Sequence, residues 1–126
     1  MTKINSFRDL TVWQVSMNLA EVCFEIVEAI PHPYRFTFAN QLLPAGISIP
    51  SNIAEGSRRP TRAYLNHVSY SLGSHGEVDT LFELIHRKKL AAEPVLSKGA
   101  VLIEPIGKML HGLSESLEAR LNTQNA

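Results

Sequence analysis

The side chains best suited to chemistry lie in the segment 48–56, together with one more distant carboxylate, Glu77. Hydroxyl, amide and carboxylate groups recur there at helical spacing, from Ser48 and Ser51 to Asn52 and Glu55. A buried carboxylate must be paired, hydrogen-bonded or protonated, so this grouping predicts either mutual hydrogen bonds or an acid–base site.

A proline and a glycine belong to the same segment. Pro50 removes one backbone hydrogen bond from a helix and costs about 3 kcal/mol, which suggests that the bend and the hydroxyls beside it have a purpose. Gly56 is placed where a helix would end, and we expect it in the C-terminal cap region.

Two interpretations of the polar set remain open. In the first, which we favour, the side chains form a network that stabilises the junction of two helices or a subunit interface. In the second, they converge on an open pocket of a small-molecule-binding protein or an unrecognised enzyme, and at least one carboxylate titrates abnormally. Both interpretations use the same five residues: Ser48, Ser51, Asn52, Glu55 and Glu77.

Known catalytic patterns are missing from the chain. It has no Gly-x-Ser-x-Gly elbow, no P-loop and no dinucleotide fingerprint. Its histidines lack the paired Glu-x-x-His spacing of bundle metal sites. Cys23 lies on an apolar face without a neighbouring basic residue, which is typical of an inert buried thiol. We therefore expect a protein that is not an enzyme, with no catalytic residue, metal or cofactor.

Basic residues form two clusters, Arg58, Arg59 and Arg62 in the first and Arg87, Lys88 and Lys89 in the second. A helix of about 25 residues between them spans about 37 Å, which places the clusters at opposite ends of the molecule. Both are candidates for phosphate contacts, although solvated helix ends are the preferred interpretation for a neutral chain. Repetition of each cluster around the rim of a ring would favour the phosphate contacts.

Composition limits the class of protein. The chain has 126 residues, 44% of them hydrophobic, and its 12 basic and 12 acidic side chains cancel. One domain covering residues 1–126 is expected, without an overall basic field. A single cysteine, no apolar run of membrane-spanning length and no signal peptide at the N-terminus predict a cytoplasmic protein without membrane contact.

Hydrophobic periodicity predicts helices at about 7–30, 34–57, 61–90 and 93–122. Short connections favour antiparallel neighbours, so the predicted fold is an all-α, up-down-up-down four-helix bundle. Pro50 should bend the second helix, which Pro44 could break, and Pro105 should kink the fourth.

The helices differ in the faces that we expect to be buried. In the second helix, the predicted inner side holds Phe36, Ala39, Leu43, Gly46 or Ile47, Pro50 and Ile53. The third helix has one heptad stripe through Tyr64, Val68, Ser71, His75, Val78, Phe82 and Ile85. It also has a stripe of small residues that would let another helix approach closely, formed by Ser69, Gly73, Gly76 and Thr80. The first helix is apolar over more than one face, which fits burial inside the bundle and against a neighbour.

Several of these motifs occur in the same order in one known family. They are the segments 7–10 (FRDL), 12–14 (VWQ), 48–56 (SIPSNIAEG), 72–74 (LGS) with Glu77, and 106–113 (IGKMLHGL). The chain closely resembles the bacterial four-helix-bundle proteins found in intervening sequences of large-subunit ribosomal RNA genes.

The resemblance implies a left-handed antiparallel bundle with a proline-kinked second helix, ring-like homopentamers and no established enzymatic activity. A distantly similar protein, the accessory factor of diversity-generating retroelements, is a basic pentamer that binds nucleic acid and a reverse transcriptase. This chain departs from the pattern at Leu43 and Pro44, where family members often carry two arginines. The expected function is a non-catalytic, homo-oligomeric scaffold, with RNA, DNA or a nucleic-acid-processing protein as the candidate partner.

Overall fold

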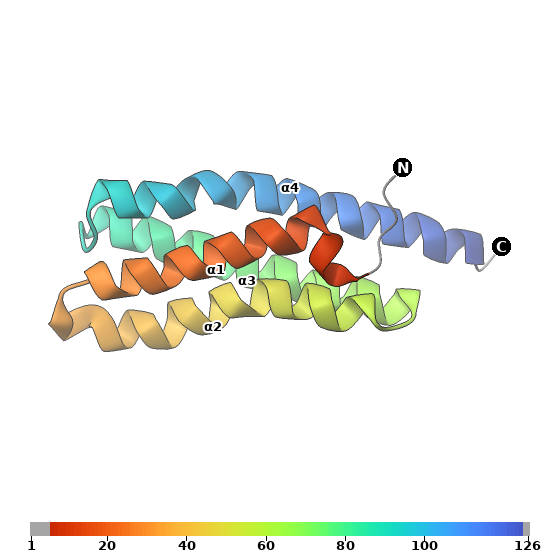
Figure 1. The fold of residues 1–126 in the computed structure, drawn as a ribbon, viewed down its shortest axis with the longest axis horizontal. Coiled ribbons are helices and arrows are strands. Elements are labelled where there is room, and N and C mark those ends of the chain that lie inside the picture. The colour runs from red at the N-terminus through yellow and green to blue at the C-terminus, as the bar shows by residue number, and fades with distance from the viewer. Residues whose placement is uncertain (1–5, 125–126) are drawn as a thin grey trace.

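In the part of the chain that the structure describes, four long helices follow one short 3-10 turn (Figure 1). The computed structural model describes residues 6–124, and the prediction about a signal peptide at residues 1–5 lies outside them. The 3-10 turn η1 spans Phe7–Asp9, and the helices are α1 (Thr11–Ala29), α2 (His32–Ser57), α3 (Thr61–Arg87) and α4 (Glu93–Gln124). Within the described residues there is no strand, which confirms the predicted all-α four-helix bundle.

Successive helices run in opposite directions, joined by short connections at 30–31, 58–60 and 88–92 (Figure 1). Each helix packs against two others, in the cyclic order α1, α2, α3, α4. The α1–α4 pair therefore lies on the side opposite the α2–α3 pair. The α2–α3 connection, η1 and the C-terminal part of α4 share one end of the bundle (Figure 1).

The first predicted helix begins later than expected. Ser6 caps η1, because its Oγ accepts the backbone N–H of Arg8 and the Asp9 carboxylate accepts the N–H of Ser6. Leu10 then adopts an extended conformation, with φ −77° and ψ 125°, and separates η1 from α1. This capping box closes a single turn, so residues 7–9 do not continue into the helix.

Two predicted helix ends are also corrected. The third helix ends at Arg87 instead of residue 90, and Lys89 follows with a positive φ of 54°. Gly56 is not the cap of α2 but a buried residue of its last turn.

The prolines of α2 and α4 do not interrupt either helix. The second helix is continuous from His32 to Ser57, so the break considered at Pro44 does not occur. The fourth helix likewise continues through Pro105. The bends at Pro50 and Pro105 stay predictions.

The expected inner face of α2 is partly wrong. Phe36 is 77% exposed and Ile47 is also exposed, whereas Phe38, Leu42 and Ile49 are buried. Apolar residues occur on both sides of α2 in nearly every turn, so periodicity does not select the buried side. In α3 only one stripe is apolar, and all of its predicted residues are buried except the half-buried His75.

Close helix contacts use glycines other than those of the small-residue stripe. Ideal Cβ atoms built on Gly73 and Gly76 meet nothing within 4 Å, so within the described residues no helix packs on this stripe. By contrast, a Cβ on Gly99 of α4 would lie 2.5 Å from the buried ring of Phe82. A close contact between α3 and α4 therefore depends on Gly99.

Replacing Gly99 by alanine should destabilise the fold by about 1–3 kcal/mol, because the buried Phe82 ring must move to admit the methyl group. Urea unfolding measures the change. Gly112→Ala in the same helix is the matched control: its Cβ meets open space. That variant should stabilise the protein by up to about 1 kcal/mol through helix propensity. Equal effects of the two substitutions would contradict the proposed contact.

Candidate functional site

The polar residues of segment 48–56 face a matching set on α3. Ser48, Asn52 and Glu55 follow one another at steps of four and three residues along α2. The partners on α3, with the same steps, are His67, Ser71 and Ser74. Such steps keep side chains on one face of a helix, and the helices are antiparallel, so the two rows meet in reverse order. We call these six residues the α2–α3 seam.

Hydrogen bonds join the two rows of the seam. The Asn52 amide donates to the carbonyl oxygen and the Oγ of Ser48, both at 3.0 Å. Its Oδ1 accepts a hydrogen bond from Nδ1 of His67 at 2.9 Å. Ser74 donates to Ser48 Oγ at 2.9 Å, and the buried Ser71 donates to the Ile49 carbonyl at 2.9 Å. The seam residues thus use one another's hydrogen-bonding capacity.

The carboxylates contribute little to the seam. Glu55 lies 3.7 Å from Nδ1 of His67, but its side chain is 65% exposed, so solvent screens this contact. Ser51 and Glu77 are exposed and make no hydrogen bond or ion pair within the described residues. Of the five predicted residues, the structure brings together Ser48, Asn52 and Glu55.

Gly56 lets α3 approach the C-terminal end of α2. A Cβ at this position would lie 2.7 Å from the Tyr64 ring and 2.8 Å from Cβ of His67. Pro50 is buried in the same helix, among the core residues Ile49 and Ile53. The segment therefore holds two helices together along most of its length.

Other potentially reactive groups are placed in inert surroundings. Burial raises the pKa of the Cys23 thiol to about 12, so the thiol stays protonated at neutral pH. His75 bonds the Ile103 carbonyl through Nε2 at 2.7 Å and links α3 to α4. Among residues 6–124, no three His, Cys, Asp or Glu side chains are grouped as a metal site would require.

The two basic clusters lie at opposite ends of the bundle (Figure 1). In the cluster that ends α3, Arg87 forms an ion pair with Glu83 at 3.2 Å, while Lys88 and Lys89 are exposed. This end is thus partly neutralised.

The other cluster gains members that are distant in sequence. We call this group the arginine end: Arg8 of η1, Arg58 and Arg59 of the connection, Arg62 of α3 and Arg120 of α4. None of them forms an ion pair within the described part of the chain. Arg8 and Arg58 instead place their guanidinium groups 4.7 and 5.7 Å from the centre of the Phe7 ring. Five arginines that form no ion pair with a described residue therefore lie at this end.

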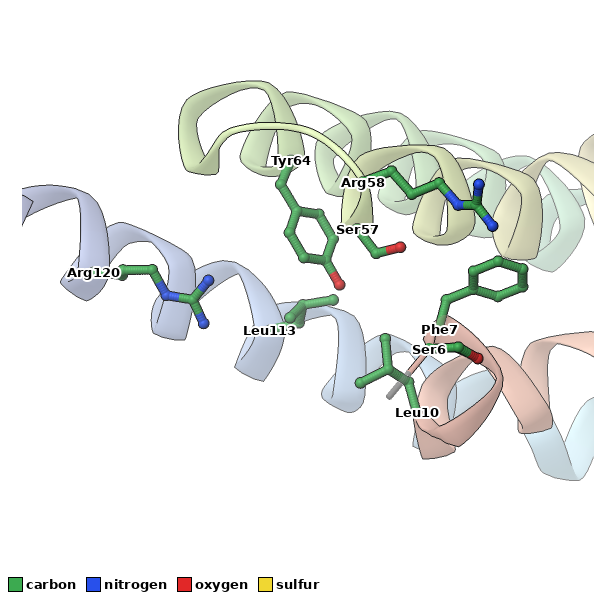
Figure 2. A pocket seen from close by; sticks show the side chains of 8 residues that line it. All are labelled: Ser6, Phe7, Leu10, Ser57, Arg58, Tyr64, Leu113 and Arg120. Atoms are coloured by element: carbon green, nitrogen blue, oxygen red, sulfur yellow. The ribbon is translucent and has the colours of Figure 1, made fainter. Parts of the chain in front are cut away.

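A cavity of about 550 Å³ opens at the arginine end (Figure 2). Residues of η1, the end of α2, the start of α3 and the last turns of α4 line it. Tyr64 points its hydroxyl group into this space, with Arg58 and Arg120 on either side (Figure 2). Burial raises the pKa of Tyr64, and the positive charge of Arg120 opposes that rise. The hydroxyl therefore stays protonated at neutral pH and can donate a hydrogen bond.

The family comparison agrees with the motif pattern. A model of the family described as 23S rRNA-intervening sequence protein matches residues 8–112. The chain belongs to this family. A search among curated proteins finds no match. The matched region includes the whole seam and most of the arginine end, and stops before Arg120.

No helix in the described range is long and apolar enough to cross a membrane.

Sequence reasoning missed the α3 partners of the seam and two members of the arginine end. His67, Ser71 and Ser74 repeat the four-and-three spacing of the α2 residues, and this signal could have identified them. Arg8 and Arg120 carry no such signal, because only the tertiary fold brings them to the 58–62 segment.

Replacing Asn52 by alanine should destabilise the protein by about 1–3 kcal/mol, because it leaves the partly buried His67 N–H without its acceptor. Chemical denaturation measures the change. Ser51→Ala, one residue away and exposed, should stay within about 0.5 kcal/mol. An unchanged stability of the Asn52 variant would show that the seam does not hold α2 and α3 together.

Proposed function

We propose that this protein is a non-catalytic, homo-oligomeric scaffold of the cytoplasm that contacts nucleic acid through its arginine end. The observation that carries the assembly is the uncovered glycine stripe of α3. Gly73 and Gly76 together cost about 2 kcal/mol of helix propensity, and no part of the described chain uses the space they leave. A second chain packed on the stripe would use it.

Large apolar side chains are exposed on the other helices too. Phe24 of α1 is 48% exposed and Val101 of α4 is 67% exposed. In a heterologous contact, one surface of a subunit packs against a different surface of the next subunit. Such contacts generate rings when the rotation closes. Here the exposed apolar side chains would project and the glycine stripe would be the recessed surface. This geometry supports the ring-like pentamer that the family resemblance implies.

Support for nucleic-acid contact comes from the arginine end. Arg58, Arg59 and Arg62 have no carboxylate partner within the described residues, and arginine is a principal contact to phosphate oxygens. Family members often carry two arginines at the positions of Leu43 and Pro44, and this chain has no positive charge there. Arg8 and Arg120 add positive charge at the arginine end instead. In a ring, this surface would recur once per subunit.

No observation favours a catalytic role for the seam. Ser48, Asn52, His67 and Ser74 bond one another, and Ser51 and Glu77 do not converge with them. The seam is proposed as a structural element of the scaffold.

Light scattering should report a particle several times the mass of the 14.0 kDa chain. Gly76→Leu should reduce it to the monomer, because the new side chain fills the stripe while leaving the helix intact. Gly112→Leu is the matched control, with equally open surroundings on α4, and should leave the mass unchanged. A monomeric unmodified protein at micromolar concentration would refute the scaffold.

Replacing Arg58, Arg59 and Arg62 by alanine should weaken the binding of single-stranded RNA or DNA. It should also lower the slope of log K against log salt by about 2, if each arginine contacts one phosphate. The control replaces Arg87, Lys88 and Lys89, which removes equal charge from the opposite end. Undetectable binding by the unmodified protein at low salt, or equal losses in both variants, would contradict a contact at the arginine end.

A further inference from the structure

The cavity at the arginine end has the composition of a binding site. Its lining combines the apolar side chains of Leu10 and Leu113 and the ring of Tyr64 with the cations Arg58 and Arg120 (Figure 2). No carboxylate lines it. A volume of about 550 Å³ lies within the range of small-molecule sites, which combine apolar walls with a few polar groups.

Tyr64 supplies an independent indication of a ligand. The residue is only 9% exposed, and its hydroxyl points into the cavity (Figure 2). The hydroxyl makes no hydrogen bond to any described residue. The hydroxyl oxygen is not one of the fully buried, unpaired atoms of the described residues, so the cavity leaves it accessible. This donor is therefore available to an oxygen atom of a bound molecule.

The charges select the class of ligand. A phosphate monoester carries about −1.5 to −2 charges at neutral pH. It therefore matches two guanidinium groups without carboxylate partners better than a ligand with a single carboxylate does. Ser6 adds a hydroxyl donor, because its Oγ already accepts a backbone hydrogen bond from Arg8 and its own O–H is uncommitted. The apolar wall then suits an aromatic group attached to the phosphate.

We propose that this cavity binds a phosphate monoester attached to an aromatic ring, as in a nucleoside monophosphate. Arg120 holds the phosphate, and Tyr64 donates a hydrogen bond to one of its oxygens. Arg58, on the other side of the hydroxyl, adds positive charge, and the ring lies against Leu10 and Leu113. Such a group has two sources, a free nucleotide or the phosphorylated end of a nucleic acid strand. The second source rests on the nucleic-acid contact proposed above, and the first does not.

Calorimetric titration with adenosine 5′-monophosphate tests the site. We expect one site per chain, with adenosine binding at least tenfold more weakly. Tyr64→Phe keeps the ring and removes the donor, and Arg120→Gln removes one cation. Each should weaken binding about tenfold or more, as expected for a hydrogen bond to a charged group.

The control for these variants is Arg62→Gln, which removes a charge from the arginine end but not from the cavity. It should change affinity less than twofold. Equal losses in Arg62→Gln and Arg120→Gln, or no binding of the monophosphate to the unmodified protein, would overturn the site. Thermal unfolding of Tyr64→Phe should match that of the unmodified protein, which separates a binding defect from misfolding.

Two oligonucleotides of one sequence, with and without a 5′-phosphate, distinguish the sources. Preferential binding of the phosphorylated strand, lost in Tyr64→Phe, supports the strand end, whereas monophosphate binding without such a preference supports the free nucleotide. If both strands bind equally through Arg59 and Arg62 while the monophosphate does not bind, the cavity proposal fails and the proposed nucleic-acid contact stands.

Discussion

The contact between α2 and α3 is the constraint on which the rest of the structure depends. Gly56 brings the backbone of α2 against Tyr64 and His67, and the seam bonds maintain that approach over about two turns of each helix. Only the three residues 58–60 connect the two helices. Because α3 cannot move away, the Tyr64 side chain extends across the end of the bundle. There it packs with Val68 and Leu117 in a small cluster separate from the main core. The cavity is thus a consequence of the seam.

The uncovered surfaces follow from the same arrangement. Polar seam residues occupy the inner side of α2 and α3 where these helices meet, so the glycine stripe of α3 is directed outward. Glycine in an exposed helix interior destabilises a single chain without any return. The other exposed glycine, Gly112, shows that one such residue is tolerated, but Gly73 and Gly76 are adjacent on one face. An assembly would offset their cost through close backbone packing, which links the stability of the subunit to its association.

The fold was largely predictable from sequence, whereas the site was only partly so. In α3 a single apolar stripe identifies its core residues, and Pro31, Pro60 and Pro94 mark where helices begin. In α2 the pairs Phe36 and Phe38, and Ile47 and Ile49, lie on opposite sides, so only packing against neighbours selects Phe38 and Ile49. The capping box of Ser6 and Asp9 spans four residues and was hidden within a longer periodic pattern. The cavity could not be predicted, because its residues come from four elements and share no spacing.

Neutral composition concealed the distribution of charge. Several carboxylates are paired along the flanks of the bundle, as in Lys98 with Glu25, Lys108 with Glu104 and Arg87 with Glu83. Each pair cancels charge locally, so a total of zero says little about the arginine end, where no ion pair forms within the described residues. A field from clustered charges acts over about 10 Å at 0.1 M salt, comparable to the width of one helix. An anion near Arg58 and Arg120 therefore responds to these cations more than to the carboxylates paired along the flanks. Local charge, and not the net value, is the quantity that decides which ligands this end attracts.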